Sequence, residues 1–102
     1  MKLPRVVHCE RADYDVYVGR GGIWGNPFKI GSDGTRDEVI EKYREWIVTQ
    51  QELMRLLPTL RGKVLACWCR PLKCHADVLI ELLDKHTDEQ LRNYDNQTKT
   101  ST

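Results

Sequence analysis

The sequence predicts an α/β protein: a small single domain whose short, mainly parallel or mixed sheet is packed by three to four helices in a Rossmann-like arrangement. Three observations predict this fold class. Short β-branched segments come first, and amphipathic segments of helical period follow them. A strand-like segment that is apolar on both faces lies between two of these amphipathic segments. Since 102 residues allow one modest core, we expect a single domain over residues 1–94 and a disordered polar tail over residues 95–102.

Two short strands are predicted near the N-terminus. The first is "RVVHC" (5–9), a β-branched run that charged residues end, and the second is "DVYVG" (15–19), which places Val16 and Val18 on one face. The segment that follows, "GRGGIWGNPFKIGSDG" (19–34), holds six of the seven glycines. We predict a long ordered or semi-ordered loop, and its apolar side chains favour order because they give it something to pack against.

The first helix is predicted from Thr35 to about Gln50. Thr35 and Glu38 have the spacing of a capping box. The apolar residues after them recur at helical spacing and form one continuous stripe. They are Val39, Ile40, Tyr43, Trp46 and Ile47. A shorter helical piece is predicted over residues 52–60, with Pro58 disturbing its end.

The third strand is predicted for "KVLACWC" (63–69), whose apolar character on both faces is typical of a central strand buried on two sides. Pro71 ends it, and helical periodicity resumes from about Lys73. The apolar face of that helix consists of Val78, Leu79, Leu82 and Leu83. Thr87 and Gln90 predict a capping box for a last short helix, "DEQLRNY".

Composition and charge exclude several classes of protein. The 16 basic and 15 acidic side chains leave a formal net charge of +1, without the basic excess expected of a general nucleic-acid-binding protein. No apolar run is long enough to span a bilayer, and the N-terminal segment lacks the apolar core of a signal peptide. We therefore expect a cytoplasmic protein without membrane contact, whose four cysteines serve as thiols, metal ligands or reactive groups rather than disulfides.

The cysteine cluster is the first candidate site. Cys67 and Cys69 point to the same face of the third strand, and Cys74 and His75 lie at the start of the next helix. The carboxyl end of a strand and a helix N-terminus together favour an anionic ligand. A zinc site would use all four residues, but the spacing departs from the two separated knuckles of structural zinc sites, so we expect no metal and no cofactor. Buried core thiols, and a capping or packing role for His75, remain alternatives.

The glycine-rich loop is the second candidate site. Arg20 and the backbone N–H groups beside it, including that of Gly21, can be presented to an anion directly after a strand. Trp24 or Phe28 could stack on a base, and Asn26 begins a turn. The alternative is a packed glycine loop with aromatic plugs.

The two motifs together resemble the domain-of-unknown-function family DUF4326. The segments "DVYVGRGGIWGNPF" and "LRGKVLACWCRPLKCHADVLIELL" are similar to its VYIGR-x-WGNPF and LRGK-x-L-x-CWC-x-P-x-x-CH-x-D-x-L motifs, and the resemblance covers roughly residues 5–84. The matching positions are Arg20, Trp24, Gly25, Asn26, Pro27, Cys67, Trp68, Cys69, Pro71, Cys74, His75 and Asp77. The second motif is also similar to a C-x-x-x-P-x-x-CHR segment of a Rossmann-like family. His8 stands where the family has asparagine.

Because the family is frequent in bacteriophages, the resemblance implies a small phage-type protein in the host cytoplasm. Our first expectation is a binding protein for a nucleotide or nucleotide-derived signal, used in anti-defence to sequester a host immune signal. The expected ligand-binding residues are Arg20, Gly21, Trp24, Asn26, Cys69, Arg70, Cys74, His75 and Asp77.

Two other classes of function remain open. One is an enzyme, a hydrolase or glycosidase that cleaves a glycosidic or phosphoester bond of a nucleotide with His75, Asp77 and Cys74 as catalytic groups. It is not preferred, because no paired carboxylates lie near the cluster. The other is a zinc-binding interaction module on Cys67, Cys69, Cys74 and His75. For all three classes we expect a homodimer or larger homo-oligomer, since a chain this short buries a limited core alone.

Overall fold

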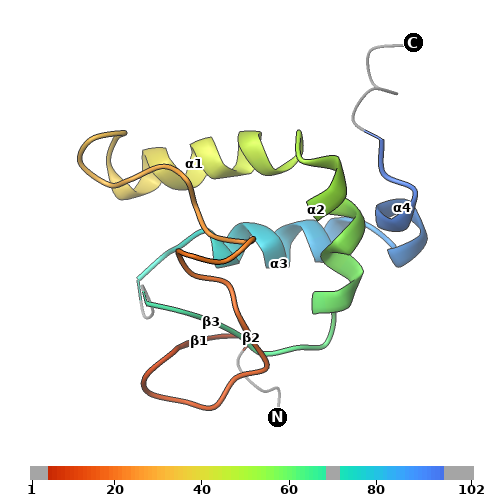
Figure 1. Ribbon diagram of the computed structural model, residues 1–102, viewed down its shortest axis with the longest axis horizontal. Helices are drawn as coiled ribbons and strands as arrows, with labels where there is room; N and C mark the ends of the chain where they lie inside the picture. The colour runs from red at the N-terminus through yellow and green to blue at the C-terminus, as the bar shows by residue number, and fades with distance from the viewer. Residues whose placement is uncertain (1–4, 69–71, 96–102) are drawn as a thin grey trace.

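The computed structural model describes residues 5–68 and 72–95, and within them the chain forms one three-stranded sheet (Figure 1). The strands are β1 (Val6–His8), β2 (Val16–Tyr17) and β3 (Leu65–Cys67). Their order is β1-β3-β2, and β3 pairs in parallel with both neighbours. The predicted class, a single α/β domain with a short, mainly parallel or mixed sheet, is confirmed, and the sheet is parallel.

The central position predicted for the third strand is confirmed by its burial. Leu65, Ala66 and Cys67 are all buried, so both faces of β3 are covered. Val6 and Val16 lie opposite Leu65 on its two sides, which places apolar side chains of all three strands on one face. That face packs against the helices.

The strands are shorter than the sequence predicts, although their hydrogen bonding continues beyond them. The Val18 N–H donates to the Ala66 carbonyl at 2.9 Å, and the Cys9 N–H donates to the Cys67 carbonyl at 3.0 Å. The chain bends at Gly19, directly after the Val18 bond to β3. Strand length depends on the partner strand, and periodicity within one segment does not carry that information.

Helix α1 (Arg36–Ile47) begins where its capping box predicts. The Thr35 hydroxyl accepts the Glu38 N–H, and the Glu38 carboxylate accepts the Thr35 N–H. The predicted stripe faces the core: three of its members are buried and the other two are half-buried against the core. The helix ends at Ile47, three residues before the predicted end, and continues as a turn.

The remaining helices follow the predicted order. They are α2 (Gln51–Leu56), the 3₁₀ helix η1 (Leu57–Leu60), α3 (Ala76–Lys85) and α4 (Asp88–Arg92). Pro58 lies at the start of η1, where its missing N–H leaves no hydrogen bond unmade. The capping box of Thr87 and Gln90 is present at α4, as predicted.

Figure 1 shows the helices on one side of the sheet and the segment that joins β1 to β2 on the other. It also shows that the carboxyl end of β3 and the N-terminal ends of α1 and α3 lie on the same flank of the molecule. No helix in the described part of the chain is long and apolar enough to cross a membrane. The predicted disordered tail falls almost entirely on residues 96–102, which lie outside the described residues.

Candidate ligand-binding cavity

A cavity of about 360 Å³ lies at the carboxyl end of the parallel strands. The end of β2 and the glycine loop (residues 19–34) form its first wall, with Tyr17, Gly19, Arg20, Asn26 and Ile30. The first turns of α1 form the second wall, with Arg36, Val39 and Ile40. The end of β3 and the residues that precede α3 form the third wall, with Cys67, Trp68, Lys73, Cys74 and His75. Open α/β sheets place their ligands at this edge.

The charge of the cavity is positive. Arg20, Arg36 and Lys73 line it, and no Asp or Glu within residues 5–68 and 72–95 does. The Arg36 guanidinium donates to the Lys73 carbonyl at 3.0 Å and so joins the start of α1 to the segment before α3. The Lys73 ammonium lies 3.6 Å from the Asp37 carboxylate, but both groups are exposed, so solvent screens this pair.

Arg20 is one of the residues that line the cavity, and it also holds the glycine loop together. Its two terminal nitrogens donate to the carbonyls of Asn26 and Phe28, at 2.6 Å and 2.9 Å. The sequence predicts a guanidinium presented to an anion. The structure shows that the same group spans two loop carbonyls, which leaves its remaining N–H groups for the cavity.

Asn26 connects the loop to α1. Its amide nitrogen donates to the Val39 carbonyl at 3.1 Å, and its side-chain oxygen accepts the Phe28 N–H at 2.9 Å. The side chain is buried and lines the cavity, so its two polar atoms position the wall.

Trp24 does not meet the cavity, although the sequence suggested it as a stacking residue. It is 5% exposed and belongs to the core, and its carbonyl accepts the Tyr43 hydroxyl at 2.8 Å. Burial raises the pKa of Tyr43, with a smaller contribution from Cys74, so this hydroxyl stays protonated and keeps donating. Phe28 and Gly21 are likewise not among the residues that line the cavity.

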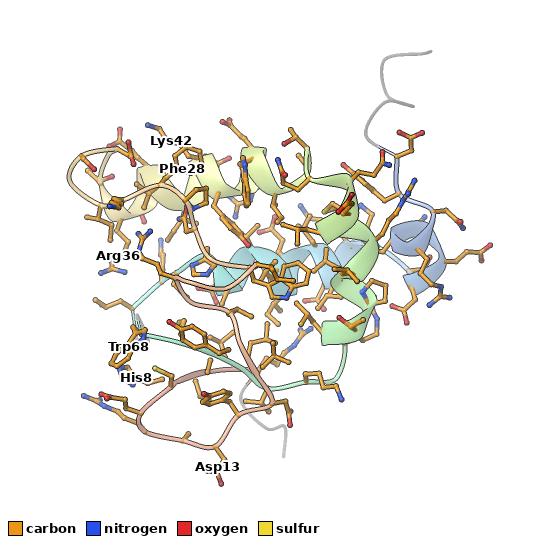
Figure 2. All side chains as sticks on the ribbon, in the orientation of Figure 1. His8, Asp13, Phe28, Arg36, Lys42 and Trp68 are labelled. Carbon is orange, nitrogen blue, oxygen red and sulfur yellow. The ribbon has the colours of Figure 1, made fainter. Side chains whose placement is uncertain are left out.

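Trp68 is the most exposed aromatic side chain that lines the cavity among the described residues. It is 56% exposed, and its ring packs edge-on against His8 with the ring centroids 5.6 Å apart. Figure 2 shows Trp68 beside His8 at the end of the sheet, with Arg36 on the same flank of the molecule. An exposed indole held by a neighbouring ring can stack on a base.

His75 is 6% exposed and is held in one orientation. Its Nε2 lies 2.5 Å from the Val18 carbonyl, so Nε2 carries the hydrogen and donates it. Burial lowers the pKa of His75, the Arg20 guanidinium lowers it further, and the Val18 carbonyl and Asp77 oppose this. The ring is therefore neutral at pH 7. Nε2 is the ring nitrogen that bonds the backbone, and His75 is one of the residues that line the cavity.

Cys67 and Cys74 lie together in the cavity wall, with their Sγ atoms 3.0 Å apart. Asp77 does not line the cavity; its carboxylate accepts the Cys74 N–H at 3.2 Å, at the start of α3. Cys69 and Arg70, both predicted ligand residues, lie outside the described residues. Within those, no three His, Cys, Asp or Glu side chains are grouped to hold a metal ion.

Sequence reasoning missed Arg36 and Lys73. They are 37 residues apart, and they meet because α1 and α3 both begin at the same edge of the sheet. A basic residue at or just before a predicted helix N-terminus is unusual, because cations are disfavoured there. The position of Arg36 and Lys73 at or just before predicted helix starts is therefore the feature of the sequence that could have indicated a site.

A family model described as a domain of unknown function (DUF4326) matches residues 3–85. An uncharacterized 12.4 kDa protein from the nrdA-td intergenic region of Enterobacteria phage T4 is 33% identical over 89 residues, which cover 82% of this chain and 81% of the phage protein. An uncharacterized protein of Acanthamoeba polyphaga mimivirus is 38% identical over 86 residues, which cover 67% of this chain and 65% of that protein. No solved structure matches significantly.

Proposed function

We propose that this chain, which belongs to the family described as a domain of unknown function (DUF4326), binds a small phosphorylated ligand of the mononucleotide class. The observation that carries the proposal is the charge of the cavity. Three cationic side chains, Arg20, Arg36 and Lys73, line it without any carboxylate from the described residues. Such a cavity favours an anion, and the planar guanidinium of arginine can hold a phosphate by two parallel hydrogen bonds.

Two helix N-termini support a phosphate at this place. Helices α1 and α3 contain 12 and 10 residues, and each begins beside residues that line the cavity. The N-terminal end of a helix carries a partial positive charge and unpaired N–H groups. Both helices therefore add to the attraction of the three cations for one anionic group.

The apolar part of the cavity supports a base attached to that phosphate. Tyr17, Ile30, Val39 and Ile40 provide apolar surface, and Trp68 provides an exposed aromatic face. A cavity of about 360 Å³ lies at the lower end of the range of ligand pockets, which suits one nucleotide better than two. The neutral His75 offers Nδ1 as an acceptor for a ligand hydroxyl or amino group.

Binding is favoured over cleavage by the position of Asp77. A hydrolase would need a second acid–base group beside His75, but the Asp77 carboxylate accepts a backbone N–H outside the cavity. Incubation of the protein with a nucleotide panel should therefore return every nucleotide intact by chromatography. Formation of free base or inorganic phosphate would instead favour the enzyme.

The viral relatives extend the proposal to a biological role. Since they come from phage T4 and mimivirus, we propose that the ligand is a nucleotide-derived signal of host defence and that the protein sequesters it in the cytoplasm of the infected cell.

The proposal is tested by thermal shift and calorimetry with AMP, GMP, CMP, UMP, adenosine and inorganic phosphate. At least one mononucleotide should raise Tm, and it should do so more than phosphate or the nucleoside. Arg36→Ala should weaken binding of that nucleotide by about 10–100-fold, the loss of one charge-assisted contact worth roughly 1.5–3 kcal/mol.

Arg55→Ala is the matched control. Arg55 also donates to a backbone carbonyl, that of Tyr94 at 2.8 Å, but it lies on α2 and lines no part of the cavity. Its replacement should leave nucleotide affinity unchanged. The proposal is wrong if no mononucleotide shifts Tm, or if the two variants weaken binding equally.

A further inference from the structure

We propose that Cys67 and Cys74 are a redox-active pair that forms a reversible disulfide in the wall of the cavity. Their Sγ atoms are 3.0 Å apart, and both side chains are almost fully buried, at 1% and 2% exposure. A disulfide bond is about 2.05 Å long, so closure needs a movement of only about 1 Å. The two residues are separated by six others in sequence, and the fold brings their thiols into contact.

Backbone hydrogen bonds hold both cysteines in place. Cys67 ends β3, lies opposite His8 in the sheet, and its carbonyl accepts the Cys9 N–H at 3.0 Å. Cys74 is held by Asp77 through two hydrogen bonds. The Asp77 carboxylate accepts the Cys74 N–H at 3.2 Å, and the Asp77 backbone N–H donates to the Cys74 carbonyl at 3.0 Å. The two thiols therefore meet because the sheet and the start of α3 are fixed, which gives each thiol a high effective concentration at the other.

The cavity gives an oxidant access to these thiols. Buried cysteines are usually inert because reagents cannot reach them. Cys67 and Cys74 both line the cavity of about 360 Å³, and this cavity is the route that we propose for the oxidant. Hydrogen peroxide is far smaller than this space. Cys9, the third cysteine of the described residues, is half-buried and does not line the cavity.

The oxidant of the proposed reaction is hydrogen peroxide. One thiol attacks the peroxide O–O bond, forms a sulfenic acid and releases one water. The second thiol then attacks the sulfenic sulfur, forms the S–S bond and releases a second water. In total two thiols and one peroxide give one disulfide and two waters. A dithiol such as dithiothreitol reverses the reaction by exchange. Such transient disulfides are the kind found in reducing compartments.

The test uses the full chain with Cys9→Ser and Cys69→Ser together, which leaves Cys67 and Cys74 as the only thiols. Peroxide should remove both titratable thiols and lower the mass by about 2 Da, and dithiothreitol should restore both. After digestion with trypsin, peptide 64–73 should be linked to peptide 74–85. Adding Cys67→Ser to this background should abolish the intramolecular link.

The same digest of the unsubstituted chain guards against a folding defect in the variants, because it needs no substitution. Linkage of peptides 64–73 and 74–85 within the unsubstituted monomer, together with linkage in the double variant, supports the pair. Oxidation of the folded double variant to sulfinic acid without linkage, or no reaction at all, overturns it.

A second measurement rests on the proposed function. If AMP binds in the cavity, it should block the route to the thiols. At ten times its Kd, AMP leaves about one site in eleven free, so disulfide formation should slow about tenfold. Linkage without any binding of AMP would reject AMP as the ligand and keep the redox pair. Binding of AMP without slower oxidation would show that the oxidant does not enter through the cavity.

Discussion

The imidazole of His75 owes its charge state mainly to burial. Nε2 donates to the Val18 carbonyl, the ring lies edge-on to Tyr43 with the centroids 4.9 Å apart, and little solvent reaches it. Burial is the largest cause of its lowered pKa, and the Arg20 guanidinium adds to it. The folded protein therefore binds a proton at this ring less readily than the unfolded chain does.

The free energy of unfolding should consequently depend on pH through His75. It should be at its full value above the ordinary histidine pKa of 6.5 and should fall as the pH drops below it, because the unfolded chain takes up the proton first. The slope from one site is at most about 1.4 kcal/mol per pH unit. His75→Gln, which can still donate to Val18, should flatten the profile measured by urea denaturation between pH 7.5 and 5.5.

His86→Gln is the control for that profile. The ring of His86 also bonds a backbone carbonyl, that of Leu82 at 2.9 Å, but it lies at the end of α3, away from the cavity. This variant should keep the slope of the unsubstituted protein. Equal slopes for the unsubstituted protein and His75→Gln would contradict the assignment.

Arg20 lines the cavity and also bonds two carbonyls of the glycine loop, so two substitutions are needed to separate ligand binding from loop stability. Arg20→Ala removes both guanidinium–carbonyl bonds and should lower the free energy of unfolding by about 1–2 kcal/mol, with allowance for solvent exposure. For a chain of this size that is a fall in Tm of roughly 5–10 °C.

Arg20→Lys keeps the charge but cannot span two carbonyls. It should lower Tm nearly as much as Arg20→Ala while retaining more affinity for a mononucleotide. Unchanged Tm in both variants would show that the loop does not depend on these bonds.

Residue types at the site could be predicted from the sequence, but not which of two similar residues serves it. Trp24 and Trp68 both lie in motifs, yet Trp24 is buried in the core and Trp68 is exposed at the cavity. Burial depends on what the rest of the chain packs against each ring. Arg36 and Lys73 were missed for the same reason, because their meeting is a property of the assembled fold.

At the scale of elements, local signals were the reliable ones. The two capping boxes, at Thr35 and Thr87, predict helix starts because the bonds that they form span only three residues. Strand ends were less predictable, since pairing with β3 decides where β1 and β2 stop. The glycine loop was predicted as ordered, and the bonds of Arg20 and Asn26 show how it is held.

The glycine loop closes on itself at Gly25, which makes this position sensitive to a side chain. A Cβ at Gly25 would lie 2.9 Å from the Gly19 carbonyl oxygen and 3.0 Å from the Arg20 Cα, both backbone atoms that cannot move alone. Gly25→Ala should therefore destabilise the protein by about 1–3 kcal/mol in chemical denaturation.

Gly22→Ala is the matched control in the same loop. The nearest atom to a Cβ there is 3.8 Å away, which is an ordinary contact. Its effect should stay within about 0.5 kcal/mol, and it can be slightly stabilising because alanine restricts the unfolded chain. Equal losses at Gly22 and Gly25 would mean that the close approach at Gly25 does not matter.

For the whole molecule, periodicity was enough to predict an α/β class with a buried third strand, because burial on both faces leaves a continuous apolar segment. The strand order β1-β3-β2 could not be read from periodicity, since any of the three strands can pair with any other on hydrophobicity alone. A central β3 predicts the position of the cavity, because the carboxyl ends of parallel strands lie at one edge of the sheet, where ligands bind.

We also propose that the protein is a homodimer or larger homo-oligomer. Several large apolar side chains of the described residues stay exposed, and Trp68 and Leu72 are each more than half exposed. Exposed apolar surface of this kind favours association when the chain is short. Light scattering at micromolar concentration should give at least twice the chain mass of 11.9 kDa. A mass of one chain would contradict the proposal.

The strand order also bears on synthesis by the ribosome. β1 and β2 hydrogen-bond to β3 and not to each other in the described part of the chain, and β3 is the last of the three to be translated. A nascent chain therefore carries two strands without a partner until Cys67 has left the exit tunnel. Both pairings then form by long-range closure, which is slow compared with helix formation. A premature stop codon between η1 and β3 would release a polypeptide that contains the segments of α1 and α2 but cannot form the sheet.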